Sequence, residues 1–262
     1  MANPPSLKSL AAKASVLRGL HAGPGMLVLP NAWDAASARV LEAAGFPAIA
    51  TTSAGVAAAL GYGDHEQAPV AEMLAAAARI AGAVAIPVTV DFEAGYGLTP
   101  REAVERLIAA GAAGFNFEDS DHRGDAPMVD AALQAERIAA LKAASRAAGV
   151  DLVLNARVDV FIHRLGTPEE QAAEGLRRAR LYRDAGADCV YPIVLSDEST
   201  IEAFAREVGP INVNLRPNGP LSLRRAAALG VRRVTYAASL FRQTMSSFEG
   251  LATALHTETQ AL

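Results

Sequence analysis

The sequence predicts the α/β class and, within it, a single (β/α)8 TIM-type barrel of eight parallel strands surrounded by helices. Short apolar runs alternate with longer alanine-rich segments of helical periodicity, as parallel strands joined by crossover helices require. Eight such runs occur, and a chain of 262 residues matches the usual length of one barrel. An open doubly wound sheet is disfavoured, because Gly95 and Gly97 lack the third glycine of the nucleotide-binding pattern.

Each predicted strand is a mostly apolar run of four or five residues. The eight runs cover residues 27–30, 48–51, 87–91, 114–118, 152–156, 188–191, 211–214 and 233–236. Several follow a glycine at which the preceding helix can end in the left-handed conformation. These glycines are Gly45, Gly111, Gly186 and Gly230. The repeated order of helix, glycine and strand favours a ring of similar units.

Both ends of the chain show helical spacing of apolar residues. The first set predicts an opening helix that lies against the barrel, and consists of Leu7, Leu10, Ala14 and Leu17. The second predicts a final helix with a partly buried face, and consists of Phe241, Met245, Phe248 and Leu255. We therefore expect residues 1–262 to form one barrel domain with an N-terminal helix and a C-terminal helical extension.

Composition restricts the partners and the compartment. The chain is 51% hydrophobic with a formal charge of -4, and it has no basic stripe of the kind that nucleic-acid-binding proteins show. The single cysteine, Cys189, cannot form a disulfide within the chain, which favours a reducing compartment. No apolar stretch is long enough to cross a bilayer. We expect a cytoplasmic protein that binds a small molecule, without nucleic-acid or membrane partners.

Acidic residues gather where the third and fourth predicted strands end, the side on which such barrels build their active sites. In an extended strand Asp91 and Glu93 would point to the same side, and two such anions repel unless a cation or proton lies between them. Together with Glu118 they predict a site for Mg²⁺, with Mn²⁺ as a substitute, bound directly or through water. The alternative is a set of solvated strand-end charges. The scattered histidines match no zinc pattern.

Several segments together resemble the isocitrate lyase and phosphoenolpyruvate mutase superfamily. They include L-P-N-A-W-D from Leu29, V-D-F-E-A-G-Y-G from Val90, F-N-F-E-D from Phe115 and N-A-R-V-D from Asn155. The resemblance implies an α/β barrel whose eighth helix is exchanged between subunits of a homodimer or homotetramer. It also implies that Mg²⁺ is chelated by a 2-oxo acid and that the reaction passes through an enolate of the pyruvate type.

The resemblance assigns roles to individual acids. Asp91 matches the family's principal metal-binding acid, and Glu93 stands where many relatives have aspartate. Glu118 matches the acid of the family's E-D pair, and Asp64 matches a loop acid that reaches toward the metal. For Asp64, which follows Gly63, a turn-forming role is the alternative.

Substrate binding is also implied by the resemblance. Arg157 matches the arginine that grips the substrate, and a guanidinium can engage a carboxylate through two parallel hydrogen bonds. Its alternative role is a structural ion pair with a nearby acid, Asp159 or Glu118. Three small residues fall where relatives hold the same carboxylate and could form an anion cradle or an ordinary helix cap, namely Thr52, Ser53 and Ala54.

One family motif is missing. The isocitrate and methylisocitrate lyases carry a K-[KR]-C-G-H loop soon after the E-D pair, whereas this chain reads E-D-S-D-H-R-G-D from Glu118. Cys189 cannot replace that cysteine, since its run predicts a buried strand and an inert thiol. His122 and Arg123 are the remaining proton donors in the loop, and we take His122 as the candidate catalytic residue, with a solvated surface position as the alternative.

The predicted function is a Mg²⁺-dependent lyase or decarboxylase that acts on a small 2-oxo or 2-hydroxy (di)carboxylic acid. Three polar residues after the sixth and seventh runs could meet a second carboxylate, namely Tyr191, Asn214 and Arg216. Two alternatives remain. One is a hydrolase or mutase that acts on the C-P bond of phosphonopyruvate, and the other is a member that binds a 2-oxo acid without turnover.

Overall fold

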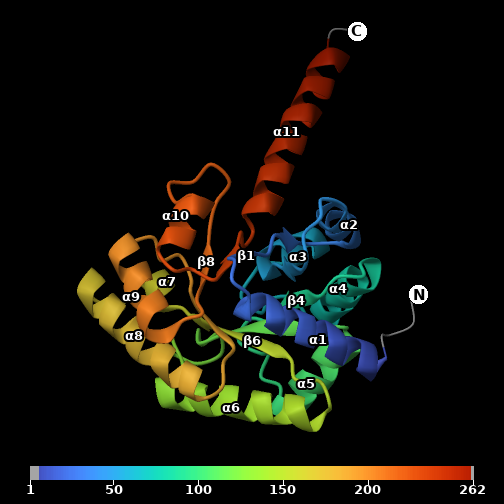
Figure 1. Ribbon diagram of the computed structural model, residues 1–262. Helices are drawn as coiled ribbons and strands as arrows, with labels where there is room; N and C mark the ends of the chain where they lie inside the picture. Colours follow the sequence, from blue (N-terminus) through green and yellow to red (C-terminus); the bar gives the residue numbers. More distant parts are fainter. Residues whose placement is uncertain (1–5, 261–262) are drawn as a thin grey trace.

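The computed structural model describes residues 6–260 and has an α/β fold in which helices surround parallel strands (Figure 1). The described strands are β1 (Leu27–Val28), β2 (Asn31–Ala32), β3 (Ile49–Thr51), β4 (Val88–Asp91), β5 (Gly114–Glu118), β6 (Val153–Val158), β7 (Cys189–Pro192), β8 (Asn212–Asn214) and β9 (Arg233–Thr235). The described helices are α1 (Leu7–Ala22), α2 (Ala35–Ala43), α3 (Ser53–Leu60), α4 (Val70–Ala83), α5 (Pro100–Ala109), α6 (Ala131–Ala147), α7 (Val160–His163), α8 (Pro168–Asp184), α9 (Glu198–Val208), α10 (Leu223–Ala228) and α11 (Ser239–Thr259).

All strand pairs within the two sheets are parallel. One sheet contains β2 to β7 in chain order, and the other has the order β1-β9-β8. An isolated parallel bridge joins Val190 to Ile211, between β7 and the residue before β8. Each of the eight predicted runs contains a strand, so these predictions are confirmed. The first run holds only β1, which pairs with β9, and β2 begins directly after the run and pairs with β3.

Local sequence signals explain where several helices begin and end. α5 and α8 each begin with a capping box, in which a threonine and a glutamate three residues later satisfy each other's backbone N–H groups. A proline follows each threonine, at the first helical position, where its missing N–H is not needed. The four glycines predicted to end helices all have positive φ, between 78° and 102°. Their left-handed conformation is therefore confirmed.

α1 lies against the strands as predicted. Leu10 and Leu17 are fully buried and Ala14 nearly so, whereas Leu7 is exposed. Leu17 belongs to a small apolar cluster with residues of β1, β3 and β6, separate from the main core. β5 and β6 are buried along their whole length. The core therefore supports the strand ends that carry the polar residues.

α11 projects away from the rest of the chain (Figure 1). None of its residues is buried, and the exposed fractions of Met245, Phe248 and Leu255 are 46%, 62% and 63%. Phe241, near the start of the helix, contacts the body of the molecule, with its ring 5.5 Å from that of Trp33. Packing of this helix face against its own barrel is therefore wrong, because the helix leaves the core after its first turn.

None of the helices described between residues 6 and 260 combines the length and the apolarity that crossing a membrane would require. The domain prediction covered residues 1–262, of which 1–5 and 261–262 lie outside the described residues.

Candidate active site

A cavity of about 180 Å³ lies at the carboxyl ends of the strands. Residues in or directly after each strand from β2 to β9 contribute to its lining. The predicted site residues that line it are Thr52, Ser53, Ala54, Asp64, Asp91, Arg157, Asn214 and Arg216. Three further predicted residues, Glu93, Glu118 and His122, are not in its wall. The structure thus brings together the predicted substrate-binding residues and one of the three predicted metal ligands.

Asp91 ends β4 and is held by three neighbours. Its backbone N–H donates to Thr51 Oγ1 at 2.9 Å, and its Oδ2 accepts from the Ser53 N–H at 3.0 Å. Its Oδ1 accepts a longer bond of 3.3 Å from Asn116 Nδ2. The carboxylate is therefore fixed in orientation while each oxygen keeps acceptor capacity for a ligand in the cavity.

Asp64 reaches the same cavity from the loop after α3. Its Oδ1 is buried and has no hydrogen-bond partner among the described residues. A buried carboxylate oxygen without a partner is costly. A turn-forming role does not explain this unsatisfied atom, whereas a bound cation or an ordered water would.

Glu93 takes a different direction from the one predicted. β4 ends at Asp91, and Glu93 has a φ of 47°, so the alternation of an extended strand does not continue to this residue. The expectation that both side chains face the same side as strand neighbours is wrong for this reason. Glu93 Oε2 accepts from the Glu66 N–H at 2.7 Å, and Oε1 accepts from the Tyr96 hydroxyl.

Burial raises the pKa of Glu93 to about 7, and repulsion by Asp91 and Asp64 adds to the increase, although its hydrogen bonds oppose it. The three carboxylates are therefore close enough to interact electrostatically. A site with this surplus of negative charge is stabilised by a cation or a proton. The electrostatics agree with the predicted repulsion even though the side chains do not converge on one point.

Glu118 lies between a cation and a histidine. Its Oε2 is 2.6 Å from Arg157 Nη2, and its Oε1 is 2.6 Å from His122 Nε2. Burial raises the pKa of Glu118 to about 8, although Arg157 opposes the increase. The bond to Glu118 raises the pKa of His122. The pair can therefore hold a proton near neutral pH. Arg157, which contacts Glu118 and lines the cavity, separates the pair from it.

His122 is only partly exposed, with 13% of its side chain accessible, and its ring centroid lies 5.3 Å from that of His65. The alternative of a solvated surface histidine is therefore wrong. Its catalytic role remains a prediction, because neither His122 nor its partner Glu118 lines the cavity.

Arg157 makes the ion pairs that the sequence offered as its alternative role, and its substrate-binding role stays a prediction. Nε and Nη2 donate to the two oxygens of Asp159, each at 2.7 Å, and Nη2 also contacts Glu118. Burial alone would lower the pKa of Arg157, but these carboxylates outweigh it and hold the pKa well above its usual value. Nη1 has no recorded protein partner within residues 6–260. One edge of the guanidinium is thus structural, and the other remains available at the cavity.

The small residues after β3 place a helix start at the cavity. Thr52 precedes α3, yet its side chain makes no capping hydrogen bond, so the ordinary-cap alternative is wrong for Thr52. The first N–H of α3, from Ser53, points to Asp91. On the opposite wall Asn214 Oδ1 accepts from the Val194 N–H at 2.9 Å, which holds the segment after β7 against the end of β8.

Two arginines near the site were not predicted. Arg233 is fully buried, and its Nη2 and Nη1 lie 3.2 Å from Asn116 Oδ1 and 3.3 Å from His21 Nε2, while its Nε has no partner. Arg242 lines the cavity from the first turn of α11. Arg233 begins a predicted strand, and nothing in that run indicates a site residue. The second lies beyond the last strand, where only the helical spacing of apolar residues was considered.

Two acids at the cavity, Asp91 and Asp64, could bind a hard divalent cation, but a third acidic ligand is not placed with them. Within residues 6–260, no group of three or more His, Cys, Asp or Glu side chains is arranged to hold a metal ion. Asp91 and Asp64 nevertheless line one cavity, and Asp64 has an unpartnered oxygen. Mg²⁺ is often bound by one or two carboxylates, with water and substrate completing its shell. The donor set therefore fits Mg²⁺ held by two acids, while three direct protein ligands are not preassembled.

Cys189 lies in β7 and is completely buried. Burial raises the pKa of its thiol to about 12. The predicted burial of this cysteine is confirmed, it does not line the cavity, and the inertness of its thiol stays a prediction.

The chain thus has a parallel α/β fold with an arginine and two acids in one cavity at the carboxyl ends of its strands. The family described as phosphoenolpyruvate phosphomutase matches residues 17–256. The chain belongs to this family, within the isocitrate lyase and phosphoenolpyruvate mutase superfamily of lyases and mutases.

Individual relatives span most of the chain. An uncharacterized Mycobacterium tuberculosis protein is 35% identical over 219 residues, which cover 82% of this chain and 80% of that one. The 2-methylisocitrate lyase of Bacillus subtilis is 26% identical, with 90% and 79% covered. The solved structure of an oxaloacetate acetylhydrolase in complex with the product oxalate has a TM-score of 0.83 and 27% identity, with 94% and 87% covered.

Proposed function

We propose that this protein is a Mg²⁺-dependent lyase or decarboxylase that acts on a small 2-oxo or 2-hydroxy (di)carboxylic acid through an enolate of the pyruvate type. The observation that carries the proposal is one cavity lined by Asp91, by Asp64 with its unpartnered oxygen, and by the free edge of Arg157. Two of the relatives are named 2-methylisocitrate lyase and oxaloacetate acetylhydrolase. These names describe cleavage of a carbon–carbon bond, which supports the same reaction class.

In this proposal Asp91 binds the metal directly and Asp64 binds it directly or through water. Glu93 and Glu118 would contact the metal only through water, because neither of them lines the cavity. Mg²⁺, or Mn²⁺ in its place, supplies Lewis acidity at the oxygen on which negative charge develops.

The remaining side chains bind and orient the substrate. Arg157 presents Nη1 to a substrate carboxylate while Asp159 fixes the plane of its guanidinium. The start of α3, with Thr52, Ser53 and Ala54, provides a positive helix end at the same carboxylate. Tyr191 also lines the cavity, and burial raises the pKa of its hydroxyl well above the ordinary value, so the group stays protonated.

Proton transfer is assigned to the Glu118–His122 pair. The two groups lie 2.6 Å apart and share a proton close to neutral pH. A proton held there can pass to the substrate side through Glu118, which is next to Arg157. His122 thereby takes the place of a loop cysteine, which this chain does not have between Glu118 and Asp130.

Cleavage of a C–P bond is the second candidate, because the matching family is described by a phosphomutase. The loop after Glu118 has no lysine of the kind that the mutases carry, which favours C–C chemistry. A member that binds a 2-oxo acid without turnover would use the same cavity.

We infer the architecture of the working enzyme from the exposed elements. The β1–β9 pair and the bridge from Val190 to Ile211 support closure of the two sheets into one barrel and one domain. The exposed apolar face of α11 supports its exchange with a second copy, in a dimer or tetramer. The single buried cysteine supports a cytoplasmic location.

The test is product analysis with matched substrates. The protein is incubated with oxaloacetate, 2-methylisocitrate, 2,3-dimethylmalate and phosphonopyruvate, with Mg²⁺ or with a chelator, and products are followed by NMR. We expect metal-dependent release of a 2-oxo acid or carbon dioxide from a C–C substrate. Turnover that survives complete removal of divalent metal contradicts the mechanism, and turnover of phosphonopyruvate alone selects C–P cleavage.

Asp91→Ala tests the metal site directly. It should abolish Mg²⁺-dependent binding of oxalate in calorimetry, because it removes the acid that faces the cavity. Asp184→Ala, at an exposed position on α8, is the matched control and should bind as the wild type does. Equal affinity in the Asp91→Ala variant would show that the metal is held elsewhere.

A further inference from the structure

Arg233 is a fully buried cation beneath the candidate active site. It begins β9, and Thr235, at the end of the same strand, lines the cavity. Side chains two positions apart on a strand point to the same side. Arg233 therefore lies on the same face as Thr235, one layer farther from the carboxyl ends of the strands. It does not line the cavity itself, so its charge is placed behind the wall.

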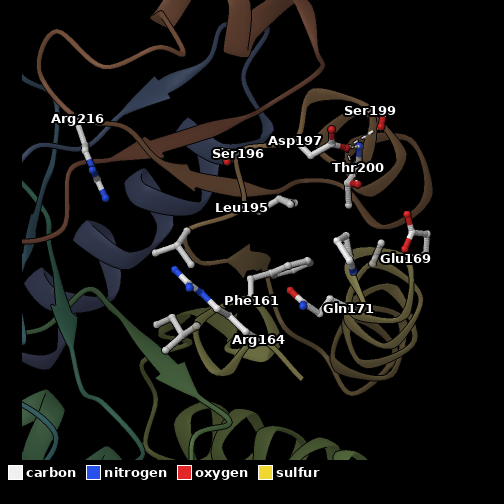
Figure 2. A pocket seen from close by; sticks show the side chains of 14 residues that line it. Phe161, Arg164, Glu169, Gln171, Leu195, Ser196, Asp197, Ser199, Thr200 and Arg216 are labelled. Atoms are coloured by element: carbon white, nitrogen blue, oxygen red, sulfur yellow. Dashed lines mark hydrogen bonds between the residues drawn. The ribbon is translucent and has the colours of Figure 1, made fainter. Parts of the chain in front are cut away.

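The other arginines near the site have an acid or solvent beside them. Arg157 pairs with Asp159 and Glu118. A larger cavity of about 870 Å³ adjoins the candidate active site, between α7, the first turns of α8 and the segment that joins β7 to α9 (Figure 2). Arg164 and Arg216 reach into this larger cavity from opposite sides and are exposed, so water can hydrate them. The buried arginine of β9 has neither kind of compensation.

Both hydrogen-bond partners of Arg233 are neutral. Its Nη1 lies 3.3 Å from His21 Nε2, and its Nη2 lies 3.2 Å from Asn116 Oδ1. His21 Nδ1 is 2.8 Å from the Leu17 carbonyl, which can only accept, so Nδ1 carries the ring proton and Nε2 accepts from the guanidinium. Burial and the charge of Arg233 lower the pKa of His21 to about 4. Neither partner neutralises the guanidinium, and its Nε has no partner among residues 6–260.

A buried charge whose partners are neutral is costly to keep. Burial lowers the pKa of Arg233, while Cys189, Tyr191 and Asp91 oppose the decrease. The guanidinium nevertheless stays charged, as arginine does in proteins. Tyr191 and Asp91 line the cavity, so the field of this charge reaches the candidate active site. Departures of this kind from the rules of core packing concentrate at functional sites.

Asn116 links Arg233 to the principal candidate metal ligand. Its Oδ1 accepts from Arg233 Nη2 and also from Asn155 Nδ2 at 2.8 Å. Because two donors hold the amide oxygen, the Nδ2 group must face the other way, where it donates to Asp91 Oδ1 at 3.3 Å. A reversed amide would turn its oxygen toward the Asp91 carboxylate. The guanidinium therefore helps to keep an N–H donor, and not an acceptor, against Asp91.

We propose that Arg233 is a positioning residue of the candidate active site, which acts through Asn116 on Asp91 and favours a bound anion over a bare metal ion. The inference rests on the proposed function and adds to that site a residue that touches neither metal nor substrate. In a buried setting a fixed cation attracts the carboxylate of a 2-oxo acid and repels Mg²⁺. The N–H donor on Asp91 likewise reduces the hold of this acid on a bare metal ion. The metal is then bound firmly only together with its anionic ligand.

The experiment measures two affinities by calorimetry, one for Mg²⁺ alone and one for oxalate at saturating Mg²⁺. The proteins are the wild type, the neutral variants Arg233→Met and Arg233→Gln, and Arg233→Lys, which keeps the charge. Arg224→Met is the matched control, because Arg224 is an exposed arginine on α10 that lines neither cavity. Each neutral variant should bind Mg²⁺ alone about threefold more tightly and oxalate about tenfold more weakly than the wild type. Arg233→Lys should change both affinities less.

The opposite signs of the two changes separate this role from a structural one. Lost packing would weaken the binding of Mg²⁺ and of oxalate together and would lower the unfolding midpoint. If the neutral variants bind both ligands as the wild type does, weaken both, or do not fold, the inference is overturned, while binding of both ligands by the wild type leaves the proposed function standing. If the wild type binds neither Mg²⁺ nor oxalate, the proposed function fails and the inference fails with it.

Discussion

Replacing Arg157 by methionine should destabilise the fold strongly. The guanidinium makes contacts of 2.6–2.7 Å to Glu118 and Asp159, both of which are buried. Removing one partner of a buried ion pair typically costs about 3–5 kcal/mol, because the remaining charge is left uncompensated. With an unfolding entropy of about 2.1 cal/mol/K per residue, this corresponds to a decrease in Tm of roughly 5–9 °C for a chain of this length.

The assay is chemical denaturation of the wild type, Arg157→Met and Arg157→Lys, with Arg101→Ala as control. Arg101 pairs with Glu105 on the surface, with 85% of its side chain exposed, so its loss should leave the stability close to that of the wild type. Arg157→Lys keeps the charge but cannot reproduce all three bonds, so we expect an intermediate loss and weaker oxalate binding. A loss below about 1 kcal/mol in Arg157→Met would refute the structural role of this arginine.

Three other predictions concern pH, thiol chemistry and assembly. Because the pKa of Glu118 is raised from 4.5 to about 8, its stabilising protonation is complete below pH 4.5 and lost as the pH rises through 8. Between pH 5 and 8 the free energy of unfolding should therefore decrease less in Glu118→Gln than in the wild type, with a difference of at most about 1.4 kcal/mol per pH unit. The same pH dependence in both proteins would contradict the raised pKa of Glu118. Cys189 should react with a thiol reagent only after unfolding, and rapid labelling of the native protein would contradict its burial. Phe248→Asp should reduce the oligomer mass in light scattering, whereas an unchanged mass would exclude α11 from the interface.

The sequence by itself determined the order of strands and helices, because periodicity, capping residues and glycines act over a few neighbouring residues. It also determined the chemical character of the site, since Asp91 and Arg157 lie at the carboxyl-terminal ends of β4 and β6 and α3 begins just after β3. The burial of Cys189 followed from its place in an apolar run. The order of the strands then brought Asp91, Asp64 and Arg157 to one cavity.

Only the tertiary structure decided which partner each charged group takes. Glu93 does not point in the predicted direction, because it has a left-handed backbone conformation after the end of the strand. Its Oε2 instead accepts a hydrogen bond from the distant Glu66 N–H. Arg233 contacts Asn116 across 117 positions of the chain, a separation at which local pattern carries no information. The larger cavity, with Arg164 and Arg216 on opposite sides, depends in the same way on how the ends of α7 and β8 are placed. Partner choice is set by long-range packing, and periodicity encodes only local conformation.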